Sequence, residues 1–97
     1  MDYIQVSLAE AIPEQARDYA SAEIGSLDRY APDRVDFAWV NLTSDKTVIH
    51  AYARLDLKWV EVQAYAEANT VTEVIDLLRE RMRRQLVSMH DCVPVHN

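Results

Sequence analysis

The chain has 97 residues and a formal net charge of −6, with 49% hydrophobic and 27% charged residues. This length and composition suit one globular domain and exclude a second, and the single cysteine, Cys92, cannot form an internal disulfide, so we expect a cytoplasmic protein. The single glycine, Gly25, excludes the Gly-rich phosphate loops, which need several glycines at fixed spacing, and no apolar run approaches the roughly 18 residues of a membrane span.

The first half of the chain predicts a strand, a helix and a second strand. Residues 3–8 alternate enough for a short strand. Pro13 suits the first position of a helix, and that helix continues to about Tyr30 through an apolar stripe at spacings of four and three: Ala16, Ala20, Ile24 and Leu27. The stretch "APDR" then ends the helix, and residues 35–42 read as the second strand.

The second half predicts two more strands and a second helix. Residues 48–57 and 60–68 read as strands. The stretch "TSDK" separates the first of them from the preceding strand, and a tight reversal at "LK" or "KW" separates the two from each other. Thr70 with Glu73 three residues later predicts a capping box. In this motif each side chain accepts a hydrogen bond from a backbone amide of the first turn that has no partner within the helix. We expect the helix to run from Val71 to about Met89.

These elements predict an α+β domain with the order β-α-β-β-β-α. The helical crossover makes the first two strands parallel, and the short later connections make antiparallel hairpins, which gives a four-stranded mixed sheet. Strands three and four alternate small apolar and polar residues, with Ala53 and Ala64 inward, so both helices should pack on that one face.

The second strand is apolar on both faces, which leaves its register open. We assign Ala38, Val40 and Leu42 inward, which turns Phe37 and Trp39 outward; the opposite register remains an alternative.

The final helix carries the stretch "LRERMRRQL", with four arginines in six residues. Helical spacing places one apolar stripe on its buried side: Val71, Val74, Ile75, Leu78, Met82, Leu86 and Met89. Arg83 and Arg84 then point away from this stripe, while Arg79 and Arg81 flank it.

These arginines have two interpretations. Residues 79–84 hold four arginines and one glutamate, whereas residues 1–69 hold twelve acids and six bases, so a local basic face could bind phosphate on an acidic protein. Alternatively the helix face is only solvated, with ordinary pairs between Asp76 and Arg79 and between Glu80 and Arg83 or Arg84.

Four aromatic residues fall on the open face of the predicted sheet: Phe37, Trp39, Tyr52 and Tyr65. They could stack on RNA bases or join a partner chain, or simply pack against one another across the strands. We expect Trp39 and Tyr52 to lie side by side.

No metal, cofactor or catalytic site is predicted. His90, Cys92 and His96 match no standard zinc spacing and lack a fourth ligand, so a frayed tail is the better interpretation. His50 is the one histidine on a predicted regular element, and no nucleophile, base and orienting group can be assembled around it, so we do not expect an enzyme.

Four stretches spread over the chain carry a recognisable pattern: "IPEQARDYA", "IGSLDRYAPDRVDFAWVNLT", "YARLDL" and "TVTEVIDLLRERMRRQL". Together they resemble the ribosome hibernation-promoting factor family, also called the sigma-54 modulation or ribosome-associated inhibitor family, and especially its actinobacterial members. The resemblance covers residues 4 to about 90 and implies one such domain over residues 1–90, followed by a tail over residues 91–97. Longer members add a C-terminal domain that pairs ribosomes, so we expect a short form or a fragment.

The family resemblance implies a non-enzymatic cytoplasmic protein without a cofactor. Such domains sit in the 30S subunit across the mRNA channel and the A and P tRNA sites, contact 16S rRNA and inhibit translation under stress or in stationary phase. By position, the residues expected to bind rRNA are Arg29, Arg34, Arg54, Lys58, Arg79, Arg81, Arg83 and Arg84.

This chain also departs from the family, because its first helix and open strands are more acidic. The alternative function is therefore a protein-interaction domain on the same fold, with weakened RNA binding, that forms a homodimer through its aromatic face.

Overall fold

A computed structural model describes residues 1 and 3–92, with side chains described for residues 1 and 3–89. The elements are β1 (Ile4–Leu8), α1 (Gln15–Gly25), the 3-10 helix η1 (Ser26–Tyr30), β2 (Val35–Asp45), β3 (Val48–Leu57), β4 (Glu61–Ala68) and α2 (Val71–Cys92). The predicted α+β class and the order β-α-β-β-β-α are confirmed. None of the helices in the described residues is long and apolar enough to cross a membrane.

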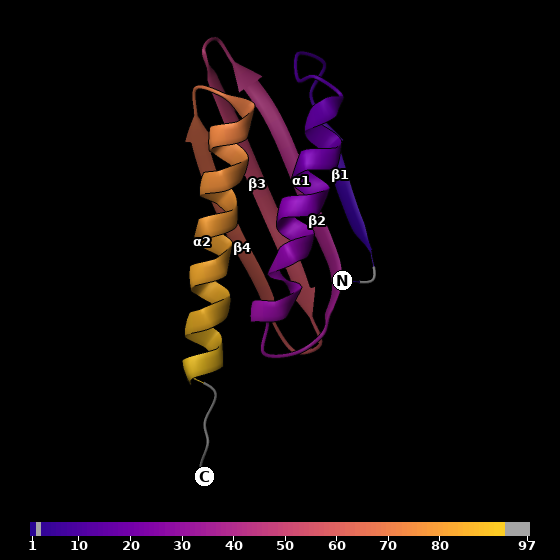
Figure 1. The fold of residues 1–97 in the computed structure, drawn as a ribbon, viewed down its shortest axis with the longest axis vertical. Coiled ribbons are helices and arrows are strands. Elements are labelled where there is room, and N and C mark those ends of the chain that lie inside the picture. The colour runs from indigo at the N-terminus through magenta and orange to yellow at the C-terminus, as the bar shows by residue number, and fades with distance from the viewer. Residues whose placement is uncertain (2, 93–97) are drawn as a thin grey trace.

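The strands form one mixed sheet in the order β1-β2-β3-β4. β1 pairs with β2 in parallel, and the two later pairs are antiparallel, as predicted. Figure 1 shows α1 and α2 side by side on one face of this sheet, with α1 against β1 and α2 against β3 and β4. No helix of residues 1 and 3–92 covers the opposite face of the sheet, so its side chains form an open surface.

The register follows the assigned alternation of small apolar residues. Val40 pairs with Ala53, which in turn pairs with Ala64, and all three are buried beneath the helices. Ala38 and Leu42 are also buried, whereas Phe37 is 43% exposed on the open face. The chosen register of β2 is therefore confirmed, and the alanines on β3 and β4 let the helix backbones approach the sheet closely.

Both hairpin turns contain two residues. β2 continues through Asp45, three residues beyond the predicted end, because Thr43, Ser44 and Asp45 pair with the start of β3 although they resemble a loop in sequence. Lys46 then adopts a φ of 56°, in the left-handed region. The second reversal lies at Lys58 and Trp59, closed by the Leu57 amide donating to the Val60 carbonyl at 2.8 Å.

The first helix differs from its prediction at both ends. α1 begins at Gln15, two residues after Pro13, and the last turn tightens into η1 rather than continuing as α-helix. Leu27 is still fully buried in this 3-10 turn, so the predicted apolar stripe is preserved.

The second helix begins as predicted and ends at Cys92, three residues past the expected Met89. The Thr70 hydroxyl oxygen accepts from the Glu73 amide at 3.1 Å. The Glu73 carboxylate accepts from the Thr70 hydroxyl at 2.9 Å rather than from an amide, so the capping box is only partly as predicted. The centre of the predicted stripe is fully buried, namely Val74, Ile75, Leu78, Met82 and Leu86.

The two helices are joined by a polar contact near the start of α2. The Tyr19 hydroxyl of α1 donates to the carboxylate of Asp76. This hydrogen bond to a carboxylate, with partial desolvation, raises the pKa of Tyr19 to about 12.

Helix side chains also cover carbonyls at both free edges of the sheet. On the β1 edge, Arg17 donates to the Val6 carbonyl. On the β4 edge, Arg81 and Gln85 donate to the carbonyls of Tyr65 and Gln63, each at 2.6 Å. Capped edges of this kind disfavour the addition of a further strand.

Candidate nucleic-acid interface

The four arginines of the final helix do not form one basic stripe, because they leave α2 in different directions. Arg79 and Arg83 lean toward η1, where their guanidinium carbons lie 6.0 and 5.9 Å from the Tyr30 ring centroid. Arg81 instead reaches the edge of β4. Arg83 is only 33% exposed, which corrects the prediction that it points away from the buried side, whereas Arg84 is 73% exposed as predicted.

A cluster of arginines surrounds Tyr30, the last residue of η1. Arg29 joins from the same turn, with its guanidinium carbon 5.6 Å from the ring centroid. The 3-10 turn carries this ring against α2, and three guanidinium groups within about 6 Å of an aromatic ring suit cation–π attraction. We call Arg29, Tyr30, Arg79 and Arg83 the Tyr30 cluster.

Arg79 is fixed on the α1 side of this cluster. Its Nε donates to the Ser26 hydroxyl oxygen at 3.0 Å and lies 3.6 Å from Glu23. Among the contacts of the described residues, Arg79 does not pair with Asp76 as expected, and Asp76 accepts from Tyr19.

Glu80 holds the two neighbouring arginines. Arg83 donates to its carboxylate through Nε at 2.9 Å and Nη2 at 2.6 Å, and Arg84 donates through Nε at 3.2 Å. These hydrogen bonds, chiefly the one from Arg83, lower the pKa of Glu80 to about 2. The intrahelical pairs expected of a solvated face are therefore present at Glu80.

The Tyr30 cluster and its surroundings retain a positive excess. Four arginines, at 29, 79, 83 and 84, face two carboxylates, Glu23 and Glu80, which leaves two positive charges. Neither Tyr30 nor Glu80 was predicted as part of a site; the adjacent pair Arg29-Tyr30 was the available signal. The arrangement offers guanidinium groups to an anion from one side of the molecule.

The remaining predicted basic residues each have a protein partner elsewhere. Arg54 lies on the open face, and Lys58 places its Nζ 5.3 Å from the Trp59 ring centroid in the β3–β4 turn. Arg34 lies 3.8 Å from Asp36 at the start of β2. The structure therefore does not bring Arg54, Lys58 or Arg34 into the Tyr30 cluster.

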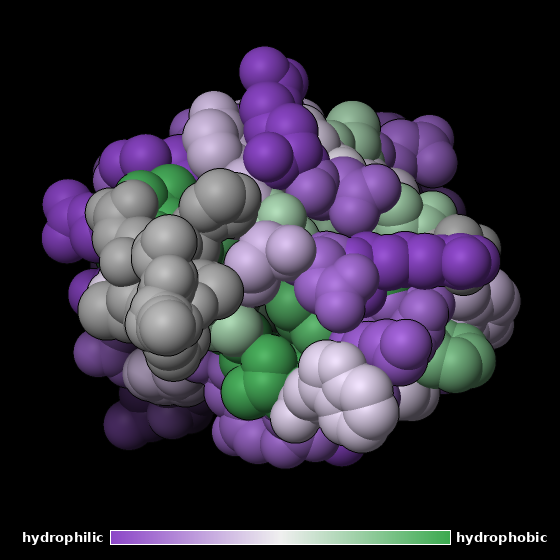
Figure 2. Space-filling model, turned by 90° about the horizontal axis from the view of Figure 1, so that it is seen from below, coloured by the Kyte–Doolittle hydropathy of each residue, from purple (hydrophilic) through white to green (hydrophobic). Residues whose placement is uncertain are grey.

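Trp59 is the most exposed large apolar side chain in the described residues, at 84%. Beside it lies a hollow of about 300 Å³ lined also by Pro32, Leu57, Val60 and Met89. Figure 2 looks at this end of the molecule and shows apolar residues reaching the surface in the middle of a hydrophilic rim. No apolar site was predicted here, although Lys58 of the same turn was expected to bind rRNA.

The four predicted aromatic residues do not form one continuous patch. Phe37 stacks on Trp39 with centroids 5.3 Å apart, and Tyr3, which was not predicted, meets Phe37 at 5.5 Å. In the described residues no ring contact joins Trp39 to Tyr52. The expectation that these two lie side by side is wrong, because Trp39 is paired across the strands with Arg54.

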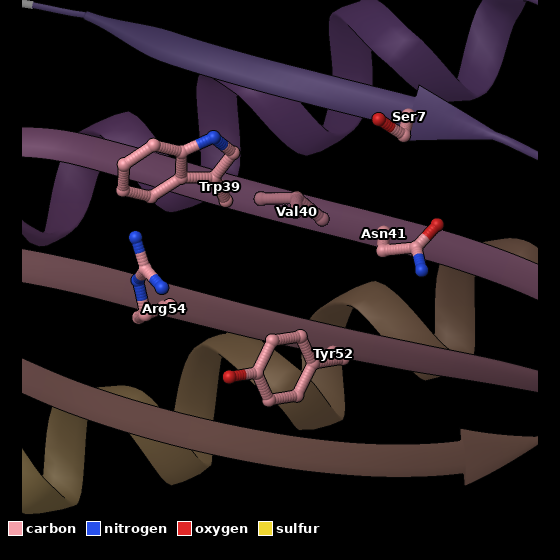
Figure 3. A pocket seen from close by; sticks show the side chains of 6 residues that line it. All are labelled: Ser7, Trp39, Val40, Asn41, Tyr52 and Arg54. Atoms are coloured by element: carbon pink, nitrogen blue, oxygen red, sulfur yellow. The ribbon is translucent and has the colours of Figure 1, made fainter.

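Figure 3 shows the hollow that separates the two rings, with Trp39 and Arg54 on one side and Tyr52 on the other. Its volume is about 590 Å³, and Ser7, Val40 and Asn41 complete its lining. The Arg54 guanidinium carbon lies 4.0 Å from the Trp39 ring centroid.

Tyr65 belongs to a separate polar cluster. Its hydroxyl donates to Glu67 at 3.0 Å and contacts Nδ1 of His50. Partial desolvation and the bond to Glu67 raise the pKa of Tyr65. His50, predicted as a lone surface histidine, thus has two partners.

Within the described side chains, no three histidine, cysteine or acidic residues are placed to hold a metal ion. The tail set of His90, Cys92 and His96 lies outside the side chains that the structure describes.

No protein-family model matches the chain. The ribosome hibernation promoting factor of Azotobacter vinelandii is 33% identical over 76 residues, which cover 78% of this chain and 70% of that protein. The ribosome hibernation promoting factor of Escherichia coli K12 is 29% identical over 85 residues, 88% of each chain. These matches do not support the narrower likeness to actinobacterial members.

Two solved structures share the fold. The N-terminal domain of Protein Y from Thermus thermophilus has a TM-score of 0.80 at 23% identity, covering 92% of this chain and 99% of that one. A ribosomal subunit interface protein from Coxiella burnetii has a TM-score of 0.78 at 20% identity, covering 92% and 98%. The sequence match to the Azotobacter factor shows that the chain belongs to the ribosome hibernation promoting factor family, a family of non-enzymatic factors.

Proposed function

We propose that this protein binds the 30S ribosomal subunit and inhibits translation as a hibernation factor under stress or in stationary phase. In this proposal it occupies the mRNA and tRNA sites through contacts with 16S rRNA. Family membership supports the general role, and the positive excess around the Tyr30 cluster is the observation in this chain that carries it.

The chemistry of the cluster suits RNA phosphates. A guanidinium group is planar and presents paired N–H donors that match two phosphate oxygens. Arg84 is largely exposed, and Arg83 and Arg79 are held in place by Glu80 and Ser26, so these two side chains lose little conformational entropy on binding. We therefore assign rRNA binding to Arg29, Arg79, Arg83 and Arg84.

Glu80 makes this assignment testable in both directions. Its carboxylate already accepts from Arg83 and Arg84, so a phosphate competes with it for the same donors. Replacing Glu80 by glutamine should strengthen ribosome binding, whereas replacing both arginines by glutamine should weaken it. A purely intrahelical role predicts no change in binding for either variant.

The experiment is sedimentation with purified 30S and 70S particles over a salt series. Each lost phosphate contact should flatten the slope of log affinity against log salt by ~0.7 to 0.9. Lys46→Gln is the control, because it removes one positive charge at the β2–β3 turn, outside the Tyr30 cluster. An unchanged slope in a folded Arg83→Gln/Arg84→Gln protein would show that these arginines do not hold the ribosome.

The alternative function, dimerisation through the open face, has less support. The four aromatic residues expected to form its interface do not make one continuous patch, since no ring contact among the described residues joins Trp39 to Tyr52. Sedimentation of the free protein at high concentration should show a monomer, and a dimer that Trp39→Lys dissociates would favour the alternative.

A further inference from the structure

The hollow between Trp39 and Tyr52 is lined by hydrogen-bonding side chains that have no partner in the described part of the chain. Among the described residues, the side chains of Ser7, Asn41 and Tyr52 form no hydrogen bond, and neither does the indole N–H of Trp39. Each of these four side chains carries a donor. The hollow, of about 590 Å³, therefore offers donors to a molecule that enters it.

Arg54 adds a planar donor group on the Trp39 side of this hollow, across from Tyr52 (Figure 3). Its Nε lies 3.2 Å from Asp56 and 3.4 Å from Glu61, and its guanidinium carbon lies 4.0 Å from the Trp39 ring centroid. Among the described residues this guanidinium group donates no aligned hydrogen bond. Since the side chain is 34% exposed, its Nη donors remain available to a ligand.

These surroundings favour a flat ligand whose ring carries no charge. Asp56 and Glu61 already offset the charge of Arg54, so an anionic group would meet carboxylates and a cationic group would meet the guanidinium. The rings of Trp39 and Tyr52 border the hollow, and aromatic rings stack well on flat π systems. A phenylalanine ring of another protein has no acceptor in its plane, so it would leave the Arg54 donors unpaired.

We propose that this hollow binds a guanine base, which stacks on the Tyr52 ring and accepts hydrogen bonds from Arg54. Guanine presents two adjacent acceptors, O6 and N7, and the guanidinium fork donates to both of them in the commonest specific contact between a protein and a base. Adenine presents an amino donor in place of O6. The hollow lies on the opposite side of the sheet from α2, so the proposal does not rest on ribosome binding by the Tyr30 cluster.

Tryptophan fluorescence reports on the hollow directly. The chain has two tryptophans, and Trp59 is 84% exposed, so Trp59→Phe leaves Trp39 as the only one. In this background guanosine monophosphate should quench the fluorescence saturably and bind about tenfold more tightly than adenosine or cytidine monophosphate. The three probes share ribose and phosphate, so the difference reports the base. Ribose 5-phosphate, which lacks a base, should leave the fluorescence unchanged.

Three variants separate the contributions of ring, fork and charge. Tyr52→Leu removes the ring, and Arg54→Lys keeps the positive charge but removes the planar fork. Each should weaken the binding of guanosine monophosphate by about five- to tenfold, and Arg54→Lys should also remove the preference over adenosine monophosphate. Arg84→Gln is the control, because it removes an exposed positive charge of the ribosome proposal from α2 and should bind the nucleotide like the parent.

A free nucleotide and single-stranded RNA both offer a guanine base, and a second probe distinguishes these sources. This probe is a decamer of uridylate with one central guanine. Quenching by the decamer alone assigns the base to an RNA strand, whereas quenching by guanosine monophosphate shows that the free nucleotide suffices. Absence of saturable quenching by either probe, equal affinity for the three monophosphates, or parent-like binding by both Tyr52→Leu and Arg54→Lys would overturn the proposal.

Discussion

Gly25→Ala should stabilise the protein slightly, because the only glycine of the chain does not need glycine's conformational freedom. Gly25 joins α1 to η1 with φ −60° and ψ −31°, which alanine adopts readily. Alanine at such a position restricts the unfolded chain and contributes about 0.4 to 1 kcal/mol.

The opposing effect is a close contact. A Cβ at position 25 would lie 3.3 Å from the terminal methyl group of Ile4, so that methyl must move by a few tenths of an ångström. Ile4 is only partly buried and lies on an edge strand, so the shift should cost less than the ~0.5 kcal/mol of a substantial rotamer distortion. We expect a net gain of roughly 0.5 kcal/mol, which corresponds to a rise in Tm of about 2 to 4 °C.

Urea denaturation and calorimetry would measure this change. Ile4→Val removes the methyl group that the new Cβ meets, so Gly25→Ala should gain more in that background. If Gly25→Ala lowers the stability and Ile4→Val does not restore it, the contact with Ile4 is not the relevant cost and the reasoning fails.

Four further changes have defined outcomes. Leu78→Ala truncates a fully buried side chain and should lower the free energy of unfolding, measured by urea denaturation, by about 2 to 5 kcal/mol, a larger loss than a surface change causes. Lys46→Gly should raise the stability by up to about 1 kcal/mol, since it relieves a non-glycine φ of 56°. Tyr19→Phe should remove the step near pH 12 from the absorbance titration of the tyrosines; a step retained near pH 12 would show that another tyrosine titrates there and would contradict the assignment to Tyr19. The Glu80 pKa is lowered from 4.5 to about 2, so the advantage in Tm of the parent over Glu80→Gln should be full above pH 4.5 and disappear as the pH falls toward 2; a pH-independent difference would contradict this assignment.

Much of the fold was predictable because its signals are local. The alternation around Ala53 and Ala64 predicts which face of β3 and β4 is buried, and the spacing of Leu78 and its neighbours predicts the buried side of α2. The capping residue Thr70 predicts where that helix begins. The end of β2 was missed because Thr43, Ser44 and Asp45 have turn-like chemistry, and their pairing with β3 outweighs it.

The candidate site was predictable only in part. The sequence identifies "LRERMRRQL" as the basic segment, since charge and helical direction can be read from spacing alone. It does not reveal that Tyr30 gathers the arginines, because that depends on a 3-10 turn packing against α2. Nor does it reveal that Arg54 is neutralised, because Glu61 reaches it from the neighbouring strand.

By itself, the sequence determined the element order, the buried faces and the polarisation of charge toward the final helix. These properties arise from residues within a few positions of one another, where backbone periodicity fixes the direction of each side chain. Only the tertiary structure decided the partner of each arginine. Arg79 bonds to Ser26 across 53 residues, and Arg81 bonds to the Tyr65 carbonyl across 16, because packing brings those groups within reach of long, flexible side chains.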